Sequence, residues 1–196
     1  YLRTLNEGDL RAAAVFFTGR PFPLSDARTL NIGAAALTRA VQEISGVSEE
    51  VLGQARLERG DLGEAAERLL HQGAGNGFVS PARIRDKLAC LASVSGAAKL
   101  PPLIDLLRGV SPVEVKYAIK IITGDLRIGL KENLVEEAIA QAFDRPVDVV
   151  RRANMVLSDI GEAAFLAQRG VLDSVSLRTF RPIKFMLATP ADAEEE

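Results

Sequence analysis

The sequence predicts an all-α protein built from two packed helical lobes. Hydrophobic residues make up 47% of the 196 residues, whereas aromatic residues make up 5% and tryptophan is absent. The core is therefore aliphatic, which favours helices. Apolar residues also recur at helical steps of three and four, and no alternating strand pattern of useful length occurs.

The first lobe is expected over residues 1–72. A short helix should begin with Asp9 as its N-cap and end near Phe17, before a turn-rich loop. A second helix is expected over 30–44, where Leu30, Leu37 and Ile44 share one stripe. Ser48 should cap a helix that runs to about residue 58, and Asp61 should cap the next one.

A glycine-rich linker over 73–79 is expected to separate the lobes, because three glycines in five residues do not hold a helix or strand. The second lobe is expected over 80–178, followed by an exit segment over 179–196. Its helices are predicted at 80–93, 101–109, 111–123, 131–143, 147–157 and 159–168. The start signals are Ser80-Pro81, Pro101-Pro102 and the capping box Ser111-Pro-Val-Glu114.

Several kinds of chemistry are excluded. The single cysteine, Cys90, cannot form an internal disulfide, so a reducing compartment is expected, and its apolar setting predicts a core position. The single histidine, His71, is expected at the surface, and no multi-histidine metal site can form. No apolar run approaches a membrane span of about 18 residues, and no phosphate-binding glycine motif follows a strand.

The net charge is −2, but the charge is uneven along the chain. Residues 75–152 carry twelve Lys and Arg against nine Asp and Glu, so a local basic face can bind phosphate on a nearly neutral protein. Within this region, KYAIKIITGDLRIGL over 116–130 combines an apolar helical run with a glycine-flanked arginine. Such a turn can offer backbone N–H groups and cations to a phosphate.

The letters GDLRIGLKENLVEEAIAQAF, over 124–143, resemble the signature of the N-terminal DNA-binding domain of ATP-dependent DNA ligases. Five further blocks agree with that domain in order and spacing. They are FFTGRPFP (16–23), LNIGAAALTRAV (30–41), ERGDLGEAA (58–66), SGAAK (95–99) and FRPIKFMLA (180–188). The resemblance covers nearly the whole chain and implies the all-α fold of that domain.

The resemblance also implies a function. The domain would grip nicked double-stranded DNA through the minor groove and the phosphate backbone, while the protein's own catalytic domains seal the nick. ATP and Mg²⁺ would serve the parent protein, and this chain alone would need no cofactor. The adenylation motif Lys-x-Asp-Gly is absent from the sequence, so the chain is expected to be an inactive, monomeric fragment. The first residue is not methionine, which fits a fragment. The parent would act in the prokaryotic nucleoid within the cytoplasm, or in a nucleus, without membrane contact.

Eight residues are candidate DNA contacts on this resemblance. In the turn, Gly124 and Gly129 would expose N–H groups, Arg127 would reach a phosphate or the minor groove, and Lys131 would pair with a phosphate. Lys120 would add charge one helical turn earlier. A second phosphate contact is expected from Ser95, Gly96 and Lys99.

The alternative is a non-enzymatic helical module that binds another protein through its apolar stripes. Salt separates the two hypotheses, because DNA binding weakens steeply with ionic strength whereas an apolar interface need not.

Overall fold

The computed structural model describes residues 1–70, 79–126, 128–177 and 183–184. Within them the chain forms α-helices and short 3-10 turns and no strand, which confirms the all-α prediction. The α-helices are α1 (Glu7–Phe17), α2 (Ala34–Ser45), α3 (Glu49–Arg59), α4 (Leu62–Leu70), α5 (Pro81–Ser93), α6 (Leu100–Arg108), α7 (Pro112–Thr123), α8 (Glu132–Phe143), α9 (Val147–Leu157) and α10 (Ile160–Arg169). The 3-10 turns are η1 (Leu2–Thr4), η2 (Gly96–Lys99) and η3 (Leu172–Ser174).

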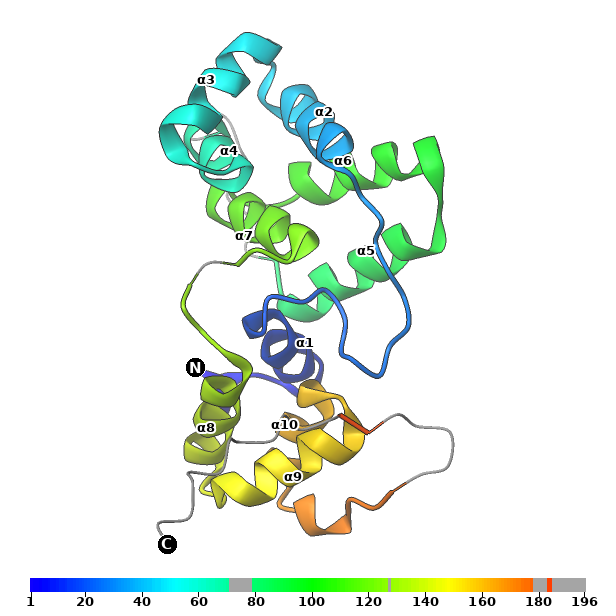
Figure 1. The fold of residues 1–196 in the computed structure, drawn as a ribbon, viewed down its shortest axis with the longest axis vertical. Coiled ribbons are helices and arrows are strands. Elements are labelled where there is room, and N and C mark those ends of the chain that lie inside the picture. Colours follow the sequence, from blue (N-terminus) through cyan, green and yellow to red (C-terminus); the bar gives the residue numbers. More distant parts are fainter. Residues whose placement is uncertain (71–78, 127, 178–182, 185–196) are drawn as a thin grey trace, which may run out of the picture.

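The helices surround two hydrophobic cores. In Figure 1 the upper core lies among α2–α7, and the lower core lies among α1 and α8–α10. Leucines such as Leu88, Leu91 and Leu103 fill the upper core, whereas Ile139 and small alanines fill much of the lower one. Small side chains let helix axes approach closely, so the lower core is compact with few aromatic groups.

The two cores do not follow the predicted boundary at 73–79. The upper core combines α2–α4 from before this segment with α5–α7 from after it, and α4 packs against α7. The lower core joins α1 to helices more than a hundred residues later. The glycine-rich segment itself, with His71, lies outside the described residues.

Helix α1 contacts both halves of the molecule, because it packs against α10 on one side and α5 on the other. Its contact with α10 depends on Gly161. A Cβ atom at this position would lie 2.5 Å from the carbonyl oxygen of Arg11 in α1. The backbones of the two helices therefore touch, and no larger residue fits between them.

The predicted start signals of most helices are confirmed. The hydroxyls of Ser48 and Ser80 accept the expected backbone N–H groups, and the box formed by Ser111 and Glu114 is complete. Asp61 Oδ1 accepts the N–H of Glu64 at 2.8 Å, as a cap of α4 should.

Three local predictions are wrong. Asn6, not Asp9, caps α1, and the Asp9 carboxylate instead accepts the N–H of Ala82 on α5 at 2.9 Å. The helix expected from Leu30 begins only at Ala34. Asn31 has a φ of 45°, which is not helical, and Leu30 lies in the preceding loop, from which its side chain is buried in the core. Cys90 is exposed, because its neighbours Leu88 and Leu91 occupy the buried face of α5.

Candidate nucleic-acid interface

The connection between α7 and α8 runs along one side of the molecule and joins its two halves (Figure 1). At its start, the N–H of Gly124 bonds to the carbonyl of Ile121 at 3.2 Å and the N–H of Asp125 bonds to Lys120 at 2.9 Å. This pair of bonds is a Schellman motif, and it requires the left-handed conformation that Gly124 adopts, with a φ of 71°. The end of α7 therefore has a fixed geometry.

The connection has an open outer surface. Gly129 has a φ of 69°, and among the described residues no heavy atom beyond its two chain neighbours lies within 4 Å of where its Cβ would stand. The same openness holds at Gly124. Ile128 and Leu130 beside Gly129 are both exposed. The main chain at these two glycines is thus open on the side where a Cβ would stand.

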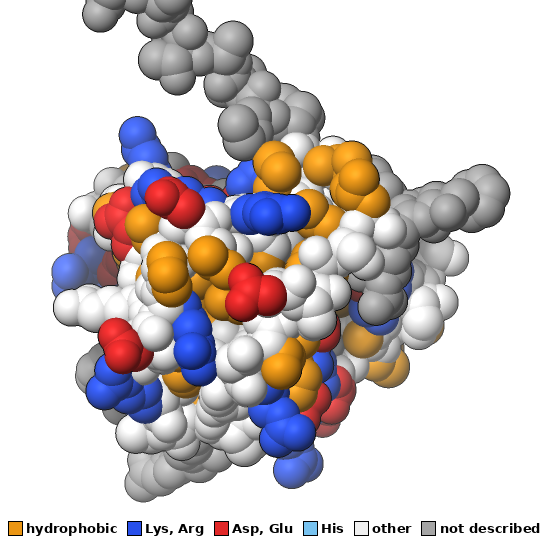
Figure 2. Space-filling view, turned by 90° about the horizontal axis from the view of Figure 1, so that it is seen from below, with side chains coloured by type: hydrophobic (Ala, Val, Ile, Leu, Met, Phe, Trp, Pro, Cys, Tyr) orange, Lys and Arg blue, Asp and Glu red, His pale blue; other side chains and the backbone are white. Residues whose placement is uncertain are grey.

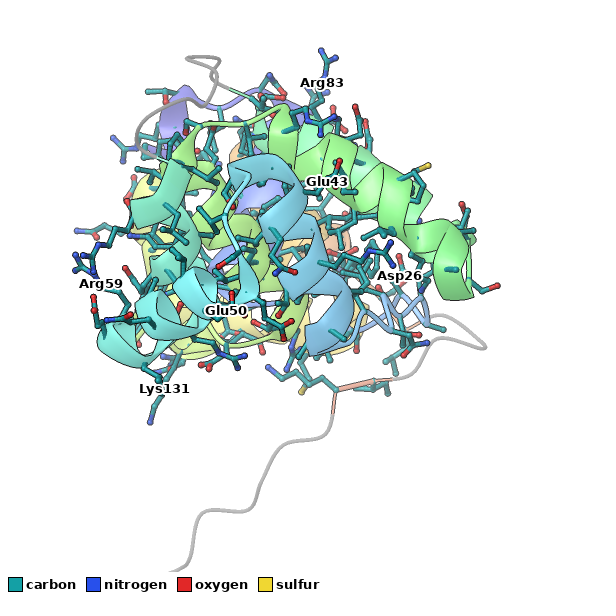
Figure 3. All side chains as sticks on the ribbon, turned by 90° about the horizontal axis from the view of Figure 1, so that it is seen from above. Asp26, Glu43, Glu50, Arg59, Arg83 and Lys131 are labelled. Carbon is teal, nitrogen blue, oxygen red and sulfur yellow. The ribbon has the colours of Figure 1, made fainter. Side chains whose placement is uncertain are left out.

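Lys131 follows at the N-cap position of α8, but its side chain makes no capping bond. It is exposed, and in the described residues it has neither an ion pair nor a side-chain hydrogen bond. Figure 3 shows its side chain extending away from the body of the molecule. An unpaired ammonium group beside a helix N-terminus favours an anionic ligand.

Glu132, the next residue, is held by several partners. Its carboxylate lies 2.9 Å from Lys184 Nζ and 4.0 Å from the guanidinium of Arg20, and it accepts the Asn154 amide at 2.8 Å. Burial raises the pKa of the Glu132 carboxyl, but these partners outweigh it and the net pKa is lowered. Glu132 is therefore a fixed anion surrounded by cations.

Lys120 lies in a different environment from Lys131. It is 7% exposed, and its Nζ lies 2.7 Å from Glu64 and 3.2 Å from Asp61, at the start of α4. Burial lowers the pKa of Lys120, but the two carboxylates outweigh it and raise the pKa overall. The ammonium group of Lys120 thus points at α4, and its evident role is to fasten the last turn of α7.

The second predicted contact is only partly open. Ser95 and Gly96 are exposed between α5 and α6, and Gly96 has a φ of 58°. Lys99 is 7% exposed and donates from Nζ to the carbonyl of Leu30. In Figure 1 this corner and the α7–α8 connection lie on opposite sides of the molecule. The structure does not bring the two predicted contacts together into one patch.

The face viewed from below, in Figure 2, carries basic, acidic and apolar side chains in a mixture. Any anion-binding property of this face is therefore local rather than spread over a uniformly basic surface. Arg127 and most of the exit segment lie outside the described residues. In the parts of the chain that are described, no cluster of His, Cys, Asp and Glu could hold a metal ion.

The description "DNA ligase N terminus" belongs to the family model that matches residues 1–140. The chain belongs to this family. Among similar proteins, a probable DNA ligase of Koribacter versatilis is 41% identical over 198 residues, which is all of this chain and 34% of that protein. A DNA ligase of Archaeoglobus fulgidus is 29% identical over 97% of this chain and 36% of its own length. A DNA ligase of Methanospirillum hungatei is 36% identical over 94% of this chain and 36% of its own.

The chain spans about a third of the length of these relatives. Across its described residues, we find no helix that is both long and apolar enough to cross a membrane. Sequence reasoning missed the grouping of Arg20, Glu132 and Lys184. No local signal could have revealed it, since the three residues come from segments that only the tertiary fold brings together.

Proposed function

We propose that this chain is the DNA-binding part of an ATP-dependent DNA ligase. It grips nicked double-stranded DNA through the minor groove and the phosphate backbone, and the remainder of the parent protein seals the nick. The family match and the names of the relatives support a ligase parent. Because a ligase must accept any sequence, contacts to phosphate and sugar suit it better than contacts to base edges.

The observation that carries this proposal is the α7–α8 connection. Two glycines at positive φ leave the backbone open, and Lys131, which has no ion pair with any described residue, follows directly. Arg127 lies between the two glycines in sequence and is assigned to the same contact. Ser95 and Gly96 form a second, smaller contact on the far side. Lys99 and Lys120 contribute indirectly. Lys99 fixes the segment that carries Ser95 and Gly96, and Lys120 fixes the end of α7 that leads into the α7–α8 connection.

In this proposal, ATP and Mg²⁺ belong to the rest of the parent, whose own domains close around the DNA that this chain holds. The parent works where the DNA is, in a nucleoid or a nucleus. The chain is proposed to act as a monomer.

Fluorescence anisotropy with two nicked duplexes of unrelated sequence tests the proposal. Both should bind with similar affinity, and about 3–5 phosphate contacts give a log–log salt slope of about −3 to −4.5. Arg127→Ala and Lys131→Ala should each make the slope shallower by about one unit. Absence of binding at low salt would contradict the proposal and favour a protein-binding module. A strong preference for one duplex would contradict the sequence-independent grip.

A further inference from the structure

Two cations from distant segments approach the carboxylate of Glu132 at the start of α8, and a third cation, Lys131, precedes Glu132 in sequence. Lys131 belongs to the α7–α8 connection, Arg20 to the loop after α1, and Lys184 to the chain after α10. Arg20 and Lys184 both approach the Glu132 carboxylate, at 4.0 Å and 2.9 Å. With Lys131 next to Glu132, the group carries three positive charges and one negative charge.

The side chains of Arg20 and Lys184 remain partly exposed to solvent while they pair with Glu132. The side chain of Arg20 is 42% exposed and that of Lys184 is 30% exposed, whereas that of Glu132 is 19% exposed. Asn154 also donates a hydrogen bond to the Glu132 carboxylate. Arg20 and Lys184 therefore keep N–H groups that are not used by Glu132. The outer surface of the group is therefore cationic.

The backbone around both cations is anchored close to the α7–α8 connection. Gly19, beside Arg20, is buried, and a Cβ there would stand 3.4 Å from the Cβ of Leu126. The N–H of Lys184 bonds to the carbonyl of Met155 in α9 at 3.0 Å. The backbone positions of Arg20 and Lys184 are thus set by the fold.

We infer that Arg20 and Lys184 are phosphate-binding residues, which extend the Lys131 contact along a DNA backbone. The inference rests on the proposed function and adds the residues that widen its contact. An arginine offers several planar donors and a lysine a mobile point charge, so the pair can follow successive phosphodiesters. Glu132 acts as a positioning residue that holds both cations in place when DNA is absent.

Matched variants separate this role from simple neutralisation of Glu132. Arg20→Ala is compared with Arg108→Ala, since Arg108 also lies 4.0 Å from a single glutamate and is well exposed. Lys184→Ala is compared with Lys87→Ala, since the Lys87 side chain is 28% exposed and pairs with Asp105 at 2.8 Å. Each variant of this chain is titrated with nicked duplex DNA over a range of salt, and its thermal unfolding is recorded.

Arg20→Ala and Lys184→Ala should each weaken binding about 3–10-fold and make the salt slope shallower by about one unit, with little change in melting temperature. The two control variants should bind as the wild type does. Arg20→Lys should largely retain the salt slope, because the charge remains.

The inference alone would be overturned if both alanine variants keep the wild-type salt slope while Lys131→Ala makes it shallower. If instead the melting temperature falls and the salt slope stays unchanged, Arg20 and Lys184 serve only to neutralise Glu132 in the folded protein. That result would also overturn the inference. A wild-type chain that fails to bind would instead overturn the proposed function itself, and the inference with it.

Discussion

At the scale of single residues, Lys120 and Lys131 show what a sequence does and does not contain. Both belong to the same signature stretch and look like equivalent cations. The fold buries Lys120 against α4, whose carboxylates lie more than fifty residues away in sequence, and leaves Lys131 exposed. Local pattern predicts where cations gather, but only the packing of distant helices decides which of them are free to meet a ligand.

The glycines of the connection permit a clean test. Gly129→Val should weaken binding to nicked duplex DNA by about tenfold or more, because a β-branched residue at a φ of 69° distorts the backbone that we propose to contact phosphate. Backbone strain of about 1–3 kcal/mol also accompanies the change.

Gly46→Val is the matched control for that strain. Gly46 ends α2 with the same φ of 69° and also has no neighbour within 4 Å. It should lose similar stability in urea unfolding yet bind DNA normally. Normal DNA binding by Gly129→Val would show that this turn does not contact DNA.

At the scale of elements, the α4–α7 contact combines close approach with charge. A Cβ at Gly63 would lie 2.9 Å from the carbonyl of Lys116, and beside it Lys116 and Lys120 pair with carboxylates of α4. The capping boxes and Pro starts predicted these helices well, because such signals are local. The first turns of α1 and α2 were misplaced, because Asp9 and Leu30 are occupied by long-range contacts.

The α4–α7 contact predicts acid sensitivity. Burial raises the pKa of Asp61, but the N–H of Glu64 and the Lys120 ammonium lower it overall, and Lys120 likewise lowers the pKa of Glu64. The folded pKa values lie below the ordinary values of 3.8 and 4.5. This stabilisation is therefore complete above those ordinary values and is lost as the pH falls through the folded ones.

Urea unfolding at about pH 6 and about pH 3 measures this effect. The double variant Asp61→Asn, Glu64→Gln keeps an N-cap and should lose less stability on acidification than the wild type. Glu43→Gln, at an exposed glutamate, should retain nearly the wild-type pH dependence. Equal acid sensitivity in the double variant and the wild type would show that the contact contributes little.

The α1–α10 contact predicts a second element-level effect. Gly161→Ala should destabilise the protein by about 2 kcal/mol or more, because the new methyl group would overlap the Arg11 carbonyl at 2.5 Å. Gly53→Ala, on the open face of α3 with nothing within 4 Å, should instead stabilise it by about 0.5–1 kcal/mol. Chemical denaturation of both variants would show whether the signs differ as expected.

At the scale of the whole molecule, the chain is expected to hold DNA without reacting. Incubation with labelled ATP and Mg²⁺, followed by denaturing electrophoresis, should show no labelled protein, because no lysine is followed by x-Asp-Gly. A full-length parent carrying that motif is the positive control. A covalently labelled band from this chain alone would contradict its assignment as the DNA-binding part.

The fold class and the family can be predicted from the sequence, but the division of the helices between the two cores cannot. A glycine-rich segment is a sensible place for a boundary, yet α4 from before it and α7 from after it pack together in one core. The grouping of Arg20 with Lys184 is likewise invisible in the sequence, since hydrophobic periodicity describes which face of a helix is buried and not which partner covers it.

The shared position of α1 has a consequence for synthesis on the ribosome. The upper core needs only helices up to α7, whereas the lower core cannot close until α10 has emerged, although its helix α1 precedes every helix of the upper core. The nascent chain must therefore carry α1 with its α10-facing apolar surface uncovered while the helices from α2 to α10 are synthesised. The long sequence separation between α1 and α10 should make docking of α1 onto α10 the slow step of folding.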